Sequence, residues 1–274
     1  MTNAALDDSL MDASIGVLLA ASPAEKCARA ASIGRRIASG ALFELPKGEA
    51  PPDRPGRPDR PLLKAPKDVP RRRLGSPEGR IALLHAIAHI EFNAIDLAFD
   101  MVVRFTADVA ALGLDAQRFA VDWAGVGVEE GVHFSMVAER LHALGGAYGD
   151  LPAHDGLWDA AFKTRKDVLP RLVVAPLILE ARGLDVTPGM IEKLNHAGDA
   201  ESAAVLQRIY DDEIGHVAAG ERWFHDICKA KNVNAEETFR DLQHTYFPAG
   251  TKPPFNHQAR MMAGLPRRYY DAQK

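Results

Sequence analysis

Two glutamate–histidine pairs with the same spacing, far apart in the chain, constrain its fold more than any other feature. Glu130 and His133 form the first pair, and Glu213 and His216 form the second. Residues three apart lie on one face of an α-helix, about one turn from each other. Two further glutamates, Glu91 and Glu180, alternate with the pairs along the chain. This order predicts four long helices whose polar faces meet.

The same order is typical of a pair of metal ions held by carboxylates inside a four-helix bundle. Each Glu-x-x-His pair supplies one histidine, and four carboxylates balance the charge of two divalent ions in a buried site. Oxygen and imidazole donors together suit iron or manganese. We therefore expect two Fe ions, or alternatively Mn or a mixed Mn/Fe pair, held by Glu91, Glu130, His133, Glu180, Glu213 and His216.

A third pair with this spacing, Glu139 and His142, provides a test of the pattern. Glu139 follows Glu130 by nine residues, which places it on the opposite helix face, so this pair is expected to face solvent. The competing interpretation is that all three pairs are surface residues of long helices. Apolar residues on the face of Glu130, among them Trp123 and Val137, oppose that interpretation.

Residues beside the ligands have predicted supporting roles. Glu129 and Asp212 each precede a ligand glutamate and are expected to accept a hydrogen bond from the histidine of the other pair. Tyr210 lies one turn before Glu213, where it either approaches the cluster or, as we favour, packs in the core. His85 and His89 point away from Glu91 and are expected to form hydrogen bonds between helices. A substrate pocket is expected between Leu84, Ala88, Phe92, Val126 and Phe134.

The helical periodicity predicts an all-α protein of four segments: an N-terminal helical extension (1–45), an extended Pro/Arg-rich arm (46–75), a four-helix bundle (76–245) and a C-terminal tail (246–274). Two short helices, separated at Ser22-Pro23, are expected within 5–40. Further helices are expected over 76–112, 115–144, 155–183, 187–197, 199–231 and 234–243, with ends set by capping residues, prolines and glycines. Pro176 is expected to kink the third long helix beside Glu180.

The arm is basic, with nine Arg or Lys and four Asp or Glu between residues 51 and 80. Two interpretations are open. A polyanionic substrate such as tRNA would bind such a segment. We favour an extended belt tied to the acidic bundle, because aspartates interrupt the arginines and few aromatic residues accompany them. The arginines concerned are Arg54, Arg57, Arg60, Arg71, Arg72 and Arg73.

Composition and the pattern of apolar and charged residues exclude some metal sites and indicate where the protein is located in the cell. The net charge is −4, and the two cysteines, Cys27 and Cys228, form no Cys-x-x-Cys motif, so a zinc ribbon or a rubredoxin-type iron site is excluded. Acidic residues precede the first apolar run, where a signal peptide would have positive charge. The apolar stretches near 16–21 and 173–179 are too short to cross a membrane. These features predict a cytoplasmic protein without a membrane segment.

Five segments of the chain carry a recognisable pattern: HAIAHIE at 85–91, EEGVHF at 129–134, YGDLPAHDGLW at 148–158, LEARGLDVTP at 179–188 and DEIGHV at 212–217. These segments resemble a bacterial ferritin-like family catalogued as domain of unknown function 455. The resemblance covers most of the chain to about residue 245. It implies the ferritin-like fold and a di-iron site at the six residues named above, and it implies no substrate.

The favoured function is an O2-dependent oxidoreductase of the oxygenase or hydroxylase type, with a small-molecule substrate and an unidentified electron donor. The alternatives are ferroxidase or iron handling, peroxide detoxification, and a metal-stabilised helical interaction protein without catalysis. A homodimer is compatible with the pattern, and tRNA is the less favoured substrate.

Overall fold

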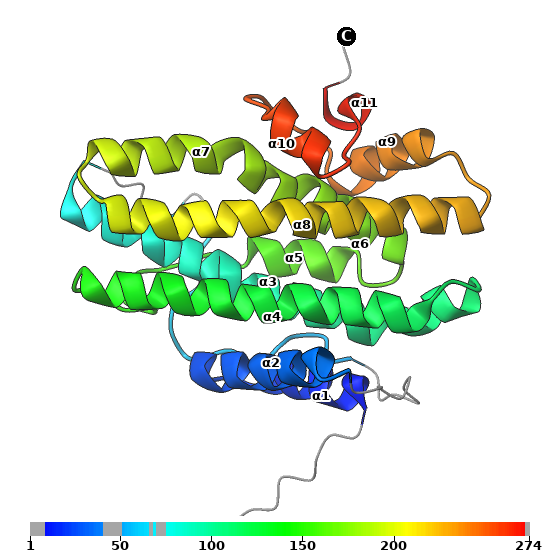
Figure 1. The fold of residues 1–274 in the computed structure, drawn as a ribbon, viewed down its shortest axis with the longest axis horizontal. Coiled ribbons are helices and arrows are strands. Elements are labelled where there is room, and N and C mark those ends of the chain that lie inside the picture. The colour runs from blue at the N-terminus through cyan, green and yellow to red at the C-terminus, as the bar shows by residue number, and fades with distance from the viewer. Residues whose placement is uncertain (1–8, 41–50, 66–67, 70–74, 272–274) are drawn as a thin grey trace, which may run out of the picture. The chain divides into compact units, whose positions relative to one another are not determined.

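The structure is a computed structural model that describes residues 9–40, 51–65, 68–69 and 75–271. The described residues form helices joined by loops, and Leu63 and Ala153 form an isolated bridge. The predicted all-α class is therefore confirmed. In chain order (Figure 1), the elements are α1 (Leu10–Leu19), α2 (Pro23–Ala38), α3 (Pro77–Ala111), α4 (Ala116–Ala143), α5 (Gly156–Lys163), α6 (Val168–Val174), the π-helix η2 (Ala175–Glu180), α7 (Ala181–His196), α8 (Ala200–Ala230), α9 (Ala235–Tyr246), α10 (His257–Met262) and α11 (Arg267–Tyr270).

Residue contacts group the chain into two units, one of Met1–Asp59 with Glu91–Val132 and the other of Arg60–Ile90 with His133–Lys274. In the first unit α1 packs against α2 (Figure 1). In the second unit α7 packs along α8, α9 packs against α8, α10 packs against α7 and α8, and α11 packs against α9 and α10. The four-segment division expected from the sequence stays a prediction.

Capping residues explain where the first helices begin and end. The hydroxyl of Ser76 accepts a hydrogen bond from the Gly79 amide at 3.1 Å, and α3 then starts at Pro77. The α3 helix ends before Gly113, whose positive φ of 74° suits glycine. The α2 helix also starts at a proline, Pro23, although the Ser22 side chain before it makes no capping hydrogen bond. The starts and ends predicted for these helices are confirmed to within a few residues.

The predicted helices over 155–183 and 187–197 are wrong in their boundaries. The chain breaks at residues 164–167, between α5 and α6, where the carboxylate of Asp167 caps the amide of Leu169 at 3.0 Å. From Val168 the helical path then runs through η2 into α7 as far as His196, with Pro188 inside α7. A proline costs a helix about 3 kcal/mol. Packing of α7 along α8 outweighs this local cost.

Pro176 is the second residue of η2, so the predicted irregularity at this proline takes the form of a π-helical segment that ends at Glu180. Proline has no amide hydrogen, which removes one backbone hydrogen bond from a regular helix. Short π-helical segments occur frequently at functional sites. This local distortion therefore determines where Glu180 lies relative to the turns before it.

Gly220 of α8 allows close packing against Pro176. A Cβ atom at Gly220 would lie 2.5 Å from the Pro176 Cβ and 2.6 Å from its Cγ. We expect Gly220→Ala to lower the free energy of unfolding by about 1–3 kcal/mol, because the proline ring cannot move aside. Urea unfolding would measure this. Gly189→Ala is the control, since a Cβ there meets nothing within 4 Å, and equal stability of the two variants would refute the packing argument.

One helix, α3, is long and apolar enough to cross a membrane, with a mean hydropathy of 1.4 over its most apolar 18 residues. The α3 helix lies outside the apolar stretches near 16–21 and 173–179 that the sequence indicated. Of that window, 72% is buried within the protein, as in the core helix of a soluble protein. The structure is thus compatible with a soluble protein.

A buried ion pair joins α2 to α3 in the first unit. Lys26 Nζ donates to the carboxylate of Asp96, and neither side chain is exposed. Burial lowers the pKa of Lys26 and raises the pKa of Asp96 to about 6, while the attraction between the two groups opposes both shifts. The second oxygen of Asp96 makes no hydrogen bond within the described residues. Removing Lys26 would therefore leave a buried carboxylate without its cation.

Part of the basic arm lies along this unit. Arg57 Nη2 donates to Asn93 Oδ1 at 2.6 Å, and Arg104 of α3 donates to the carbonyl of Pro52 at 2.9 Å. The amide of Gly56 also donates to the Leu18 carbonyl at 2.7 Å. These contacts show that parts of residues 52–57 lie against α1 and α3, and the choice between a belt and a polyanion-binding segment stays a prediction. Arg54 and Arg60 are exposed, and Arg71, Arg72 and Arg73 lie outside the described residues.

Candidate metal centre

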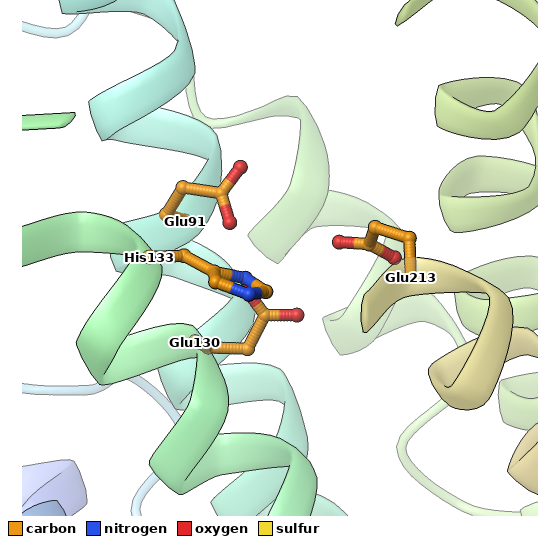
Figure 2. A group of neighbouring side chains, drawn as sticks. All are labelled: Glu91, Glu130, His133 and Glu213. Carbon is orange, nitrogen blue, oxygen red and sulfur yellow. The ribbon is translucent and has the colours of Figure 1, made fainter. Parts of the chain in front are cut away.

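Four of the six predicted ligands form one group. Each of Glu91, Glu130, His133 and Glu213 offers an atom that could bind a metal, and these atoms all lie within 4.8 Å of one another. Figure 2 shows the carboxylates of Glu91 and Glu130 and the His133 ring converging, with Glu213 pointing toward them. Glu91, Glu130 and His133 are almost completely buried, and Glu213 is half-buried. A buried cluster of glutamates and histidine could therefore bind a metal ion.

His216 lies beside this group. Its Nδ1 is 3.6 Å from Glu213 Oε2, and its ring centroid is 5.8 Å from that of His133. Glu180 is half-buried at the end of η2 and is not one of the four residues that converge. Its role as a ligand, like that of His216, stays a prediction.

Asp212 holds the imidazole ring of His133. The distance between Asp212 Oδ2 and His133 Nε2 is 3.1 Å, and Arg208 Nε donates to the same oxygen at 2.6 Å. Burial alone would raise the pKa of the Asp212 carboxyl, but hydrogen bonds from Arg208 and His133 outweigh burial and lower it. An ionised Asp212 stabilises the tautomer with a proton on Nε2, which leaves Nδ1 of His133 as the atom able to bind a metal.

Arg208 was not among the residues predicted to support the site. The spacing of Arg208 and Asp212 could have indicated the contact, because arginine and aspartate four residues apart on a helix commonly pair. For the other two residues given supporting roles, the structure shows the following surroundings. Glu129 is exposed on α4, and the Tyr210 hydroxyl accepts a hydrogen bond from Asn256 Nδ2 at 3.0 Å. Their predicted roles beside the ligands, like that of Asp212 beside a metal, stay predictions.

The carboxylates and the imidazole of the four-residue group are suited to binding a cation. Three carboxylates within such a short distance repel each other, and burial strengthens that repulsion. A divalent ion between them removes the repulsion and satisfies the carboxylate oxygens. The donors are oxygen and imidazole nitrogen without thiolate, which suits manganese or iron better than a soft metal. The residues present therefore fit a metal of this class.

The expected pocket residues are all buried, namely Leu84, Ala88, Phe92, Val126 and Phe134. The Phe134 ring makes an edge contact with Tyr148, with centroids 5.1 Å apart, and Lys26 Nζ lies 5.2 Å from the Phe92 ring centroid. Their burial shows that they belong to the core. Whether they surround a substrate stays a prediction.

The Glu139–His142 pair is exposed, as predicted from its helix face. His85 and His89 bind a loop and do not belong to the metal-binding group. His85 Nε2 accepts from the amides of Gly149 at 3.0 Å and Leu151 at 3.3 Å. His89 bonds the Tyr148 hydroxyl at 2.9 Å and the His154 carbonyl at 3.1 Å. The expectation of hydrogen-bonding roles is confirmed, but the partners lie in the loop after α4.

The buried imidazole of His85 is expected to make the folded protein less stable as the pH falls. Burial lowers the pKa of His85, and an Nε2 that accepts two amide hydrogens must be unprotonated. Because the folded-state pKa is below the unfolded-state pKa of about 6.5, the unfolded chain gains protons first as the pH falls, and stability decreases. We expect this acid-dependent loss to be smaller in His85→Gln. Urea unfolding at pH 7.5, 6.5 and 5.5 would measure it, and parallel pH profiles would contradict it.

Comparison with known proteins identifies the family. The pattern of a family described as "Protein of unknown function (DUF455)" matches residues 19–271. The chain belongs to the DUF455 family. A relative of the chain, an uncharacterized protein of Haemophilus influenzae, is 44% identical over 214 residues, which cover 78% of this chain and 74% of that protein. No solved structure matches the chain. The DUF455 part of the resemblance is thus confirmed, and the family description assigns no activity.

Proposed function

We propose that this DUF455 protein is a di-metal carboxylate protein with a ferritin-like four-helix bundle. The observation that carries the proposal is the convergence of Glu91, Glu130, His133 and Glu213 in a buried site. Two iron ions are the favoured occupants, and manganese or a mixed pair is the alternative. Glu180 and His216 complete the proposed ligand set, in agreement with the two Glu-x-x-His pairs.

An iron pair at this site would supply the activation of O2. The protein supplies positioning and shielding. Asp212 keeps the His133 ring in one orientation and one tautomer through the 3.1 Å hydrogen bond. Buried apolar residues such as Phe92 and Phe134 exclude water from reactions nearby. The function that follows is an O2-dependent oxidoreductase of the cytoplasm, acting on a small molecule and receiving electrons from a separate donor.

Metal content tests the first part of the proposal. The full chain, purified without added chelator, is expected to contain about two iron or manganese ions, measured by mass spectrometry. Glu130→Ala and Glu213→Ala are expected to lose most of this metal. Glu139→Ala, which changes an exposed glutamate of α4, is the matched control and should retain it. An unmodified protein that is fully helical but without metal would refute the proposal and leave a helical binding protein.

Reaction with oxygen tests the second part. Exposure of the reduced, iron-loaded protein to O2 is expected to give a new absorption signal that Glu130→Ala lacks. Continued uptake and mineralisation of added iron would instead favour iron handling. Rapid reaction with peroxide, but not with O2, would favour detoxification.

A further inference from the structure

A cavity in the second unit, separate from the four-residue group, has the composition of a ligand pocket. Its volume is about 280 Å³. The apolar walls include Ile178 and Leu179 of η2, and Phe247 and Phe255 of the segment that follows α9. An engineered cavity of about 150 Å³ holds benzene, so this one has room for a chain of roughly six to ten carbon atoms.

Arg260 of α10 contributes a buried guanidinium group to the lining of this cavity. Its side chain is 1% exposed, and its Nε and Nη2 donate to the two oxygens of Asp185 at 2.8 and 2.7 Å. The guanidinium lies over the Tyr270 ring, 4.3 Å from the centroid. Nη1 is also buried, but it makes no hydrogen bond within the described part of the chain. Buried arginine donors are rarely left in this condition, because the lost hydration is costly.

The charges around the cavity favour an anion. Three cationic residues line it, Arg182, Lys252 and Arg260, against the single carboxylate of Asp185. Asp185 is already engaged by both nitrogens of the Arg260 fork. Arg182 Nη1 lies 3.4 Å from Asp185 Oδ2 and also donates to the carbonyls of Lys252 at 2.8 Å and Pro254 at 2.9 Å. With three cationic groups and one carboxylate, the lining has an excess of positive charge that would attract a negative group on a ligand.

We propose that this cavity binds a small carboxylic acid with an apolar body. The carboxylate accepts a hydrogen bond from Arg260 Nη1 and is attracted by Lys252. The hydrocarbon part lies against Ile178, Leu179, Phe247 and Phe255. A pocket with apolar walls and few fixed polar groups is the usual form of a small-molecule site. The proposal does not depend on a metal, although Leu179 directly precedes the proposed ligand Glu180.

A series of matched probes tests the proposal on the unmodified full chain. Octanoate, octan-1-ol and octylammonium share one chain and differ in the charge of the head group. In calorimetric titrations octanoate is expected to bind saturably at one site, about ten- to a hundredfold more tightly than octanol, with no binding of octylammonium. Equal affinity for octanol would refute the role of Arg260. The absence of saturable octanoate binding would show that Arg260 only anchors the C-terminal segment.

Two variants locate the bound carboxylate. Arg260→Gln combined with Asp185→Asn keeps an amide–amide hydrogen bond in place of the buried ion pair and is expected to lose the preference for octanoate over octanol. Lys252→Gln changes an exposed side chain and is expected to weaken octanoate severalfold without affecting folding. Unchanged octanoate affinity in Lys252→Gln and in a folded double variant would overturn the proposal. If the double variant does not fold, the probe series and Lys252→Gln still decide the question.

A carboxylate could also bind at the proposed metal centre, so the two sites must be distinguished. Glu130→Ala, which is expected to lose its metal, should bind octanoate as tightly as the unmodified chain does. Loss of octanoate binding in that variant would assign the carboxylate to the metal centre and refute the cavity proposal. Retained binding in a chain that never contains metal would support the cavity and contradict only the proposed function.

Discussion

Asp212→Ala is expected to weaken metal binding about 10- to 100-fold, the usual effect of removing a carboxylate that orients a metal-binding histidine. The physical reason is the 3.1 Å contact between Asp212 Oδ2 and His133 Nε2. Without this acceptor, the His133 ring can rotate and can take the tautomer that protonates Nδ1. Competition with a chelator of known affinity, at fixed pH, would measure the change.

Asp211→Ala is the matched control for this experiment. Asp211 precedes Asp212 on α8, is exposed, and accepts a hydrogen bond from Gln207 at 2.9 Å. Its removal changes the net charge by the same amount and is expected to leave metal affinity within about twofold. Equal affinities in the two variants would show that Asp212 does not orient a ligand.

Lys26→Met is expected to lower the free energy of unfolding by about 3–5 kcal/mol at pH 7.5, because it leaves the fully buried Asp96 without its cation. Thermal and urea unfolding of the full chain would measure the loss. The loss should shrink as the pH falls toward 5.5. A buried carboxyl has a folded-state pKa above its unfolded-state pKa, so ionisation at high pH destabilises the folded chain and protonation at low pH relieves that cost.

Two variants separate this explanation from a general effect on α2. Arg29→Met removes an exposed pair with Glu25 and is expected to cost less than about 1 kcal/mol. Lys26→Met combined with Asp96→Leu removes both charges and is expected to recover most of the stability lost by the single variant. Failure of the double variant to recover stability would attribute the loss to packing and not to the unpaired charge.

Much of the candidate site could be read from local spacing. Glu130 and His133 had to share a helix face whatever the surrounding fold, because they are three residues apart. The exposure of Glu139 and His142 followed from the same geometry. Residues whose role depends on a distant partner were harder to predict. Asp212 directly precedes its ligand glutamate, but only the packed structure shows that it contacts His133 of another helix.

The helix ends predicted near Glu180 are wrong because they were inferred from local residue propensities alone. Gly183 and Pro188 predicted the end of one helix and the start of another, and both residues lie inside α7. Local propensities amount to a few kcal/mol at most, whereas packing along α8 acts over the whole length of the helix. The break that the sequence did not show, between α5 and α6, is stabilised by Asp167 and by Arg171, whose guanidinium donates to the Ala161 carbonyl at 2.7 Å.

By itself, then, the sequence determined the helical class, most helix ends, and the four residues of the buried group that could bind a metal. These properties depend on residues within a turn or two of each other, where backbone sterics, caps and helical spacing act directly. The tertiary structure alone decided which side chains from distant parts of the chain meet. The pairs Lys26–Asp96 and Arg260–Asp185 join residues 70 and 75 positions apart. Such contacts form only after helices pack, because burial is what makes a charge require its partner.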